Sequence, residues 1–435
     1  MYLAAALRER GHRPKILDMR IRPLPPSDLA REIKAFKPDL VGLSAFSVEM
    51  PKARELAGTI RREAGFSGPL VLGGPHASAA GAAVLSEPLV DFALAGEGEI
   101  AFPRLVEALA AGNRAAIREI PGIFLRENGG VVSTGKPKPS ADVNLLPHPA
   151  WDLVDVPAYF SAIRTCFLKN RPYMPVFTSR GCPYGCIYCH NIFGKRFRAR
   201  SPENVLSEME TLVRRYGVRE FEIQDDIFNF DRDRAAAVCE GIIRAGWNVK
   251  ISFPNGLRCD ILPRDLLALM RRAGAYFLAV AVETASPRLQ KMIRKNLDLA
   301  AVERAARDAR DLGVITIGNF MLGFPGETRA EILETIRFAC SLPLNFASFM
   351  TVTPFSGTRL AEACRKDTAP GEEEMHFYRT SHNLSSLSDA EFFPLRRQAY
   401  RRFYAGMHRR VFGSGAFRAL ALGRAASHYI RMQLA

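Results

Sequence analysis

Three cysteines, Cys182, Cys186 and Cys189, lie within eight residues of one another, directly after an expected strand at 176–180. Three thiolates on one short loop can hold an iron–sulfur cluster through three of its irons, which leaves the fourth iron without a protein ligand. An open coordination position of this kind is where a small molecule can bind and react. A closed zinc site is the alternative, but it usually needs a second, distant pair of ligands, and His190 follows Cys189 too directly to complete a tetrahedral site.

Length and composition limit the classes of protein that this chain can be. Its 435 residues suffice for two or three domains, and no apolar run approaches the roughly 18 residues that a membrane span needs. Eight cysteines in so long a chain do not make a disulfide framework, so we expect a reducing, cytoplasmic compartment. The net charge is +15, but the arginines are scattered without interleaved aromatic residues until the C-terminus, so we expect no nucleic acid partner.

Short apolar runs alternate with helical patterns in the first part of the chain, and glycines stand at the ends of the runs. This alternation predicts an α/β domain with a doubly wound, Rossmann-like sheet whose loops receive a ligand. We place this domain at residues 1–135 and a Pro-rich linker at 136–165. The expected elements are helices 2–11, 29–36 and 52–64, strands 15–18, 40–46, 70–72 and 92–94, and a hairpin at 122–134.

The middle of the chain repeats a strand followed by a helix six times, which predicts an open (β/α)6 barrel over residues 166–358. In parallel barrels the active site lies at the C-terminal ends of the strands. The clearest helix is 201–216, because Ser201 suits the N-cap and Pro202 the first helical position. The expected strands are 176–180, 221–224, 249–253, 277–282, 315–322 and 346–352.

The Cys-x3-Cys-x2-Cys spacing, with Tyr188 just before the last cysteine, resembles the signature of the radical SAM enzymes. The resemblance implies that Cys182, Cys186 and Cys189 hold a [4Fe–4S] cluster, that S-adenosylmethionine chelates its fourth iron, and that Tyr188 packs near the adenine. One electron from an external reductant of the flavodoxin or ferredoxin type would then cleave S-adenosylmethionine to a 5′-deoxyadenosyl radical. That radical would abstract hydrogen from a carbon of a small-molecule substrate.

Four later strand ends carry further candidate site residues, three of them at positions that resemble family elements. Asp225 and Asp226 stand where many members carry Gly-Gly-Glu, which implies contact with the methionine amino group; a helix-capping turn is the alternative. Arg258 ends the third strand, where a guanidinium can clamp a carboxylate or form a surface ion pair. Glu283 resembles the start of the family's Glu-Ser-Gly segment and would bond the ribose hydroxyls. Gly323 opens a turn similar to Gly-x-Pro-Gly-Glu-Thr, whose glycines admit the backbone close to adenine.

The N-terminal glycine loops resemble those of B12-binding domains in radical SAM proteins. Ser44 and the pair Gly73-Gly74, with 26 residues between Phe46 and Gly73, match the serine and glycine elements of cobalamin-binding Rossmann-like domains. The Asp-x-His-x-x-Gly element that supplies a cobalt ligand elsewhere is absent, so we expect His76 at the cofactor's edge rather than on cobalt. The resemblance therefore implies cobalamin as a third cofactor, next to loop residues Ser44, Gly73, Gly74, His76, Gly96 and Glu97.

With cobalamin bound, the resemblance suggests transfer of a methyl group to a substrate carbon. Radical cyclisation, oxidation or rearrangement without methyl transfer is the alternative reaction, and a sensor that uses the cluster as a switch is the alternative outside enzymes. A methylthiotransferase is a weaker rival, because its additional cluster needs three more cysteines and this chain has none before Cys166.

The two ends of the chain carry separate expectations. Residues 359–435 form a helical, basic region, with nine arginines and one glutamate from Glu391 onward. Such a region either contacts anionic lipid as a peripheral membrane segment or packs its aromatic residues on the neighbouring domain. At the other end, the chain opens inside the helix 2–11, whereas a doubly wound domain opens with its innermost strand. We therefore expect about 20 or more residues upstream that supply this strand, and weak cobalamin binding without them.

Overall fold

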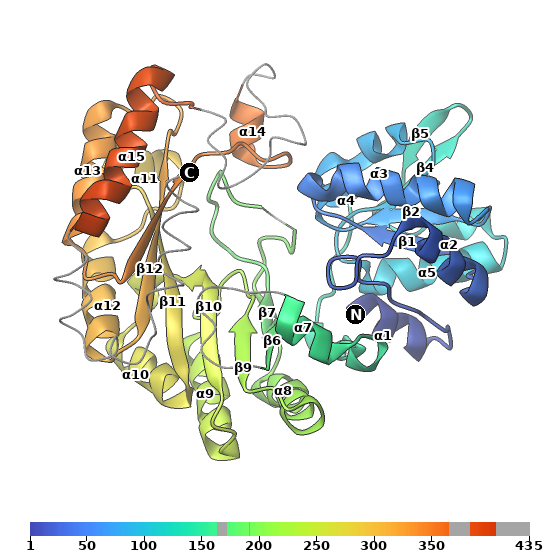
Figure 1. Cartoon of the computed structure of the whole chain (residues 1–435), viewed down its shortest axis with the longest axis horizontal. Coiled ribbons are helices and arrows are strands. Elements are labelled where there is room, and N and C mark those ends of the chain that lie inside the picture. The colour runs from blue at the N-terminus through green and yellow to red at the C-terminus, as the bar shows by residue number, and fades with distance from the viewer. Residues whose placement is uncertain (163–171, 191, 365–382, 406–435) are drawn as a thin grey trace. The chain divides into compact units, whose positions relative to one another are not determined.

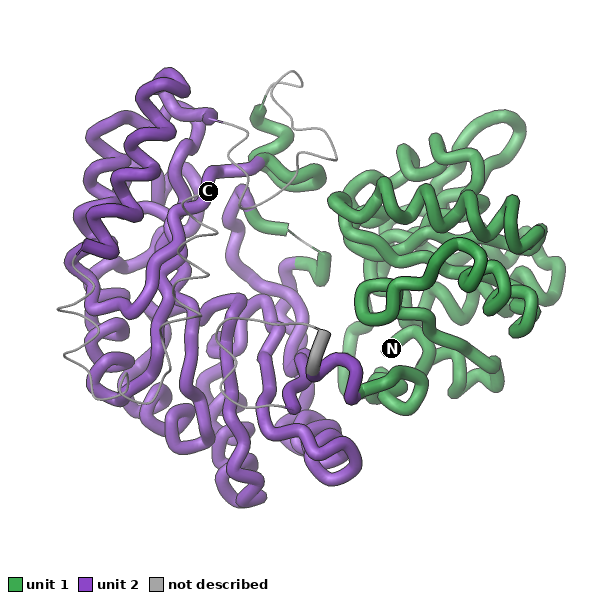
Figure 2. Tube along the Cα trace, viewed as in Figure 1, with its two compact units in different colours: residues 1–156, 189–194, 354–376 green, residues 157–188, 195–353, 377–435 purple. Residues whose placement is uncertain are grey.

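The computed structural model describes residues 1–162, 172–190, 192–364 and 383–405 (Figure 1). They form two compact units (Figure 2). Unit 1 comprises Met1–Val156, Cys189–Gly194 and the described part of Pro354–His376, and unit 2 comprises the described parts of Pro157–Tyr188, Lys195–Thr353 and Phe377–Ala435.

Unit 1 contains a five-stranded sheet in the order β1-β2-β3-β4-β5. The first three strands are parallel, and β4 and β5 form the predicted antiparallel hairpin. Asn128 and Gly129 turn this hairpin with φ values of 49° and 78°, as an Asn-Gly turn requires. The strands are β1 (Val41–Ser44), β2 (Leu70–Gly73), β3 (Phe92–Leu94), β4 (Ile123–Glu127) and β5 (Gly130–Ser133).

Helices cover both faces of this sheet. In β2, Leu70 and Leu72 join one apolar cluster with α2 and α3, whereas Val71 points to the other face and packs with α5. This alternation is the doubly wound arrangement that the sequence predicts. The helices are α1 (Tyr2–Glu9), α2 (Pro26–Phe36), α3 (Met50–Gly58), which continues as the π-helical turn η2 (Thr59–Glu63), α4 (Pro75–Ala80), α5 (Gly98–Ala110) and α6 (Arg114–Arg118).

The strand expected at 15–18 is not formed, so that prediction was wrong. Within the described residues β1 is an edge strand of the sheet, and this segment does not pair with it. Lys15 instead forms an ion pair with Glu32 of α2 at 2.6 Å and lies 5.4 Å from the centre of the Phe36 ring. Contacts with α2 therefore hold the segment outside the sheet.

Residues 136–156, which the sequence places in a linker, pack against unit 1. Pro137 lies so close to Gly96 that a Cβ atom there would come within 2.6 Å of it. Further along, the amide of Ala150 donates a hydrogen bond to the carbonyl of Met1 at 3.4 Å. Two short 3-10 turns, η4 (Val143–Leu145) and η5 (Trp151–Leu153), shape this segment before α7 (Val156–Ala162).

Unit 2 is built on a six-stranded, all-parallel sheet in the order β13-β12-β11-β10-β9-β6. Neighbouring strands follow one another along the chain, apart from the short pair β7 and β8, so the sheet is the predicted open (β/α)6 array. The strands are β6 (Tyr173–Val176), β9 (Glu220–Ile223), β10 (Lys250–Leu257), β11 (Ala275–Glu283), β12 (Ile315–Leu322) and β13 (Phe346–Thr351).

The first of these strands begins and ends earlier than the sequence predicts. The main-sheet strand stops at Val176, and Ser179–Arg180 forms a separate short strand, β7, paired with β8 (Arg198–Ala199). The chain leaves the sheet where Thr178 and Ser179 turn their hydroxyls toward Asp225. This departure sets the start of the cysteine loop.

Helices line one face of this sheet (Figure 1). The predicted cap of α8 is confirmed, because Ser201 Oγ accepts a hydrogen bond from the amide of Asn204 and Pro202 occupies the first turn. Gly217 ends α8 with a φ of 68°. The helices are α8 (Pro202–Tyr216), α9 (Arg232–Ala245), α10 (Arg264–Ala273), α11 (Pro287–Met292), α12 (Leu299–Asp311) and α13 (Arg329–Ser341), with the 3-10 turn η6 (Cys259–Ile261) before α10.

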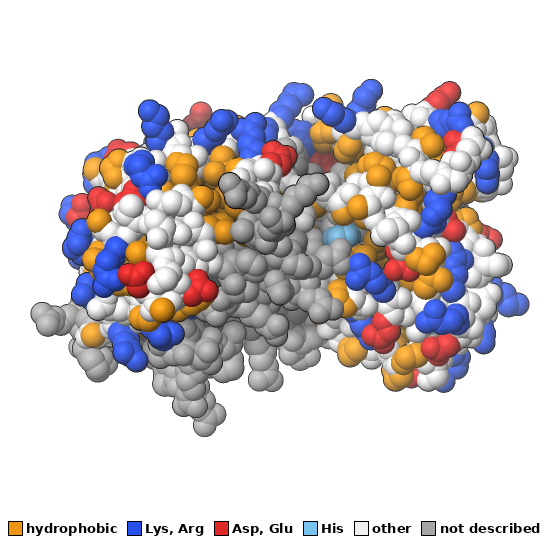
Figure 3. All heavy atoms as spheres, turned by 90° about the horizontal axis from the view of Figure 1, so that it is seen from above, with side chains coloured by type: hydrophobic (Ala, Val, Ile, Leu, Met, Phe, Trp, Pro, Cys, Tyr) orange, Lys and Arg blue, Asp and Glu red, His pale blue; other side chains and the backbone are white. Residues whose placement is uncertain are grey.

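The C-terminal region is described for α14 (Arg359–Ala363) and α15 (Asp389–Ala405). Phe392, Tyr400 and Phe403 of α15 are buried in unit 2, so the described aromatic residues pack on the neighbouring domain. Residues 406–435, with the rest of the basic tail, lie outside the described residues. No helix in the described ranges is both long and apolar enough to cross a membrane. On the face seen in Figure 3, the basic side chains of the described residues are interspersed with acidic and apolar ones.

Candidate functional site

The cysteine loop follows β7 at the end of the first strand segment of unit 2. Cys182 and Cys186 are half-buried, Cys189 is exposed, and none of the three forms a disulfide bond. Burial raises the pKa of the Cys182 thiol, and the neighbouring Asp226 and Cys186 raise it further, although a hydrogen bond with the backbone of Tyr184 opposes the rise. In the described part of the chain, no three His, Cys, Asp or Glu side chains converge as a metal site. Three accessible thiols on one loop are nonetheless the donor set that a cluster takes.

Two contacts fix the loop to its surroundings in unit 2. The amide of Ile187 donates to the carbonyl of Ile293 at 3.1 Å, which ties the loop to the end of α11. Lys195 Nζ donates to the carbonyl of Tyr184 at 2.8 Å and brings a positive charge to the thiols. Both contacts hold backbone beside the cysteines, so they set where thiolates would stand.

The two predicted carboxylates after β9 point in different directions. Asp225 is 2% exposed; it accepts hydrogen bonds from the Thr178 amide and from the hydroxyls of Thr178 and Ser179. Burial raises the pKa of Asp225, although Arg234 opposes this. Asp226 is exposed and accepts a hydrogen bond from the amide of Gly181 at 3.0 Å. A ligand can therefore reach Asp226, whereas Asp225, contrary to expectation, anchors the chain that enters the cysteine loop.

Glu283 ends β11 in a strained conformation. Its φ of 69° lies in the left-handed region, which costs a residue other than glycine on the order of 1–3 kcal/mol. The residue is 6% exposed, and its Oε1 lies 2.9 Å from Lys295 Nζ. Lys295 Nζ also donates to the hydroxyl of Tyr188 at 3.3 Å, so this lysine joins the strand end to the cysteine loop. Tyr188 in turn lies edge-on to Phe324, with 6.3 Å between ring centres.

The guanidinium of Arg258 is already engaged on three sides. Its Nη2 donates to Asp260 Oδ2 at 2.9 Å and to the carbonyl of Lys295 at 3.0 Å. Its Cζ lies 3.7 Å from the centre of the Tyr184 ring, in a cation–π arrangement. Arg258 is thus neither a surface ion pair nor an uncommitted clamp, because it holds the aromatic residue between Cys182 and Cys186.

Gly323 begins the turn that follows β12, with a φ of 93°. A Cβ atom at this position would come within 3.0 Å of the Phe392 ring, so α15 packs directly on the turn. The amides of Gly323 and Phe324 donate to Glu327 Oε2 at 2.6 and 3.1 Å. Glu327 is fully buried, and burial raises its pKa to about 7.

Sequence reasoning missed Lys295, Thr178 and Ser179. Lys295 follows Glu283 by twelve residues and belongs to no motif, so only the fold brings their side chains together. Thr178 and Ser179 lie inside the expected strand 176–180, where hydroxyls read as ordinary strand residues. Two buried hydroxyls directly before a cysteine loop were the one available signal for a carboxylate partner.

In unit 1, the predicted glycine loop packs tightly against the end of β1. Gly74 has a φ of 91°, and a Cβ atom there would come within 2.7 Å of Ser44 Oγ. His76 is 6% exposed, and its Nδ1 lies 3.1 Å from Ser47 Oγ. Ser44, Gly73, Gly74 and His76 thus lie together where β1 and β2 end, and Gly74 admits no side chain.

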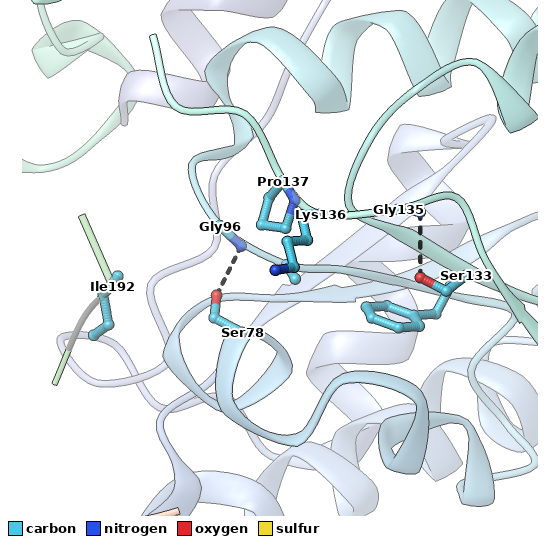
Figure 4. Close-up of a pocket in the computed structure, with 9 residues that line it drawn as sticks. Ser78, Gly96, Ser133, Gly135, Lys136, Pro137 and Ile192 are labelled. Atoms are coloured by element: carbon cyan, nitrogen blue, oxygen red, sulfur yellow. Dashed lines mark hydrogen bonds between the residues drawn. The ribbon is translucent and has the colours of Figure 1, made fainter. Parts of the chain in front are cut away.

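Gly96, at the end of β3, lines a pocket of about 320 Å³ in unit 1. The Gly96 amide donates to Ser78 Oγ at 2.9 Å, and Lys136 and Pro137 lie beside it (Figure 4). Glu97 is half-buried and precedes α5. The volume stands at the low end of the roughly 300–1,000 Å³ of small-molecule sites, so it suits part of a large cofactor. The other residues that line the pocket are Ala95, Phe124, Ser133, Gly135 and Ile192.

Comparison with known proteins agrees with this division of the chain. The model of the B12 binding domain matches residues 1–106, and that of the Radical SAM superfamily matches residues 176–339. A protein of Pyrococcus horikoshii named uncharacterized methyltransferase PH0819 is 33% identical over 410 residues, which cover 93% of this chain and 86% of that protein. This chain belongs to the B12-binding-domain-containing radical SAM family.

Other members of the family are similar over most of the chain. Cytidylyl-2-hydroxyethylphosphonate methyltransferase of Streptomyces wedmorensis is 28% identical, over 90% of this chain and 82% of that enzyme. Among solved structures, the radical S-adenosylmethionine methyltransferase TsrM of Kitasatospora setae superposes with a TM-score of 0.70 at 22% identity, over 80% of this chain and 69% of that one. The structural likeness confirms the fold of a B12-binding-domain-containing radical SAM protein.

Proposed function

We propose that this chain is a cobalamin-dependent radical SAM methyltransferase. The observation that carries the proposal is that one chain joins a B12-binding unit to a (β/α)6 unit whose first strand segment leads into Cys182, Cys186 and Cys189. The methyltransferase names of similar proteins over nine-tenths of the chain support methyl transfer in preference to other radical reactions. When bound, the cluster would supply the electron that cleaves S-adenosylmethionine, and cobalamin would supply the methyl group.

The residues of the cysteine loop and of the strand ends that follow it divide between holding the cofactors and holding the loop. In this proposal the three thiolates hold a [4Fe–4S] cluster, and the exposed carboxylate of Asp226 accepts hydrogen bonds from the methionine ammonium of S-adenosylmethionine. Glu283 accepts from the ribose hydroxyls, and Lys295 Nζ is paired with its Oε1. Tyr188 and the turn at Gly323 border the adenine. Arg258 acts through Tyr184 and therefore positions the loop.

In unit 1 the proposed cobalamin site is the set of loops after β1, β2 and β3. Gly73 and Gly74 let a flat ligand approach the backbone closely, because neither carries a side chain. Ser44 and the Gly96 loop, with Glu97, border the same end of the sheet. His76 is bonded to Ser47 inside the unit, which supports a role at the cofactor's edge rather than on cobalt.

The proposed partners follow from this chemistry. A small-molecule substrate supplies the carbon that receives the methyl group, and an external reductant of the flavodoxin or ferredoxin type supplies the electron. A reducing, cytoplasmic compartment suits exposed cluster thiols such as Cys189. Contact of the basic tail with a membrane surface is a separate proposal, which concerns residues outside the described ranges.

The test uses the full chain, reconstituted with iron and sulfide and reduced with dithionite. We expect iron and sulfide near four per chain and 5′-deoxyadenosine from S-adenosylmethionine. Alanine at Cys182, Cys186 or Cys189 should abolish cluster assembly, whereas Cys340→Ala, away from the loop, should retain it. Cluster retention in all three loop variants contradicts the radical SAM assignment. 5′-Deoxyadenosine without S-adenosylhomocysteine, once a substrate is present, would favour a radical reaction without methyl transfer.

A further inference from the structure

Half-exposed residues of five main-sheet strands of unit 2 lie on one face of the sheet. Most strand residues are buried on both faces, and the half-exposed pairs Glu222 and Gln224, and Asn319 and Met321, are two residues apart, as the two-residue period of a strand requires. Phe320 and Phe349 mark the covered face, since their rings stack at 5.3 Å and Phe349 also meets Tyr400 of α15. The half-exposed residues of β6, β9, β11, β12 and β13, together with the residue that follows β9, are Pro175, Glu222, Gln224, Ala281, Asn319, Met321 and Met350.

The strand registers place these residues on the same face, which we call the inner face. Glu222 stands between Pro175 and Ser252 on the neighbouring strands. Ala281 lies beside Asn319, and Met321 lies beside Met350. Side chains of paired residues in a parallel sheet point the same way. The inner face therefore has a polar part on β9 and a largely apolar part across β11, β12 and β13.

Glu222 is the acidic residue at the centre of the polar part. Gln224 Nε2 donates to Glu222 Oε1 at 2.6 Å, and Asn255 Nδ2 in turn donates to the carbonyl of Gln224 at 2.9 Å. Within the described residues, Glu222 Oε2 has no hydrogen-bond partner. This carboxyl is thus held in place through one oxygen and presents the other to the inner face. Neither the proposed cofactor contacts nor the cysteine loop uses it.

A second carboxylate, Glu220, lies two residues before Glu222 on the same face of β9. Glu220 is fully buried and accepts a hydrogen bond from the hydroxyl of Tyr276. Burial raises the pKa of Glu222, and the charge of Glu220 raises it further, although the bond from Gln224 opposes this. The register places Lys250 of β10 beside Glu220, whereas the neutral Ser252 stands beside Glu222. The second carboxylate oxygen of Glu222 is therefore the acceptor that a cationic group would meet on this face.

We propose that the inner face binds the substrate, and that the substrate is a small amphipathic molecule whose protonated amine bonds to Glu222. Its apolar body lies on Ala281, Met321 and Met350, which present methyl and thioether groups at one side of the same face. This inference rests on the proposed function, because it is the radical SAM unit whose inner face would receive a substrate. It names a substrate class and a residue, Glu222, that the cofactor chemistry does not require.

The test compares three probes that share one apolar body, using the full chain at neutral pH: 3-phenylpropylamine, 3-phenylpropan-1-ol and 3-phenylpropanoate. Binding is measured by calorimetry or by ligand-detected NMR. We expect the amine to bind at least tenfold more tightly than the alcohol and the acid. Glu222→Gln should weaken binding of the amine about tenfold and leave the alcohol unchanged. Glu240→Gln, an exposed residue of α9, is the matched control and should change nothing.

Equal affinity for the three probes, or an amine affinity that Glu222→Gln does not change, would overturn the inference. If thermal unfolding shows that Glu222→Gln is not folded, the order of the three probe affinities for the unchanged chain still decides the substrate class. Met321→Gln gives a second check, because it should weaken all three probes alike. The 5′-deoxyadenosine assay tests the proposed function separately. If no 5′-deoxyadenosine forms but the chain still prefers the amine, only the proposed function is overturned. If 5′-deoxyadenosine forms but the chain does not prefer the amine, only this inference is overturned.

Discussion

Lys295 Nζ lies 2.9 Å from Glu283 Oε1, and the two side chains are 9% and 8% exposed. An ion pair so far from water needs its partners complete, because a buried charge left alone keeps its full desolvation cost. Here the pair also holds Glu283 in its left-handed conformation and bonds Tyr188 in the cysteine loop. The strained strand end and the cluster loop therefore depend on one lysine.

We predict that Lys295→Met lowers the free energy of unfolding by about 3–5 kcal/mol, because it leaves the carboxylate of Glu283 buried without a partner. Urea unfolding measures the change. Lys291→Met, at an exposed position of α11, is the control and should change stability by about 0.5 kcal/mol or less. Adding Glu283→Gln to Lys295→Met should recover part of the loss. A single variant as stable as the unchanged chain would show that the pair carries no such role.

Asp225 and Asp226 should respond differently to the same substitution. Asp225→Ala removes the acceptor of three hydrogen bonds and leaves Arg234 buried beside it, so we predict a loss of about 3–5 kcal/mol and reduced iron content. Asp226→Ala, at an exposed position, should fold and assemble the cluster but bind S-adenosylmethionine more weakly. Circular dichroism, iron analysis and equilibrium dialysis distinguish the two. Equal losses of stability would contradict the division of roles.

We predict that the free energy of unfolding depends on pH through the buried carboxyl of Glu327. Its pKa in the folded protein is about 7, against 4.5 for the ordinary group, since burial outweighs the hydrogen bonds from Gly323 and Phe324. The folded state therefore holds this proton more tightly than the unfolded state. Stability from the protonated group is complete below about pH 4.5 and is lost as the pH rises through about 7, by ~3 kcal/mol in all.

The measurement compares the unchanged chain with Glu327→Gln by urea unfolding between pH 5 and 8.5. Glutamine keeps an oxygen for the two amides but does not titrate, so the free energy of the variant should fall less over this range. Glu240→Gln, at an exposed position, should follow the unchanged chain. If the free energies of unfolding of the unchanged chain and of Glu327→Gln change in parallel with pH, the carboxyl of Glu327 is not the cause of the pH dependence.

The sequence predicted what local pattern determines. The two-residue and helical periods gave both sheets, and Ser201 with Pro202 gave the start of α8. The prediction of a strand at 15–18 was wrong, because a local sequence pattern does not show whether a neighbouring strand is available for pairing. Lys15 forms an ion pair with Glu32 of α2 instead. In the candidate site, motif order singled out Glu283 and Gly323, which the structure places at the ends of β11 and β12. It missed Lys295 and the buried bonds of Asp225, because burial and pairing between distant segments are not visible in a local motif.

α15 packs along β13 of the sheet of unit 2. Among the described strands β13 lies at the edge of the sheet. Tyr400 of α15 places its hydroxyl 2.9 Å from the amide and 3.2 Å from the carbonyl of Phe349 on that edge. Tyr404 meets the amide and carbonyl of Ala347 in the same way, at 3.3 and 3.0 Å. The two hydroxyls thus pair backbone groups that another strand would otherwise occupy.

Tyr400→Phe should lower the free energy of unfolding by about 1–3 kcal/mol, because it leaves the amide of Phe349 buried without a partner. Tyr404→Phe should cost less, since this side chain is half-buried and water can replace the hydroxyl. Urea unfolding of both single variants and of the double variant measures the two contributions. A double variant that remains as stable as the unchanged chain would show that ring packing alone holds α15, and that the edge of β13 needs no hydroxyl to satisfy it.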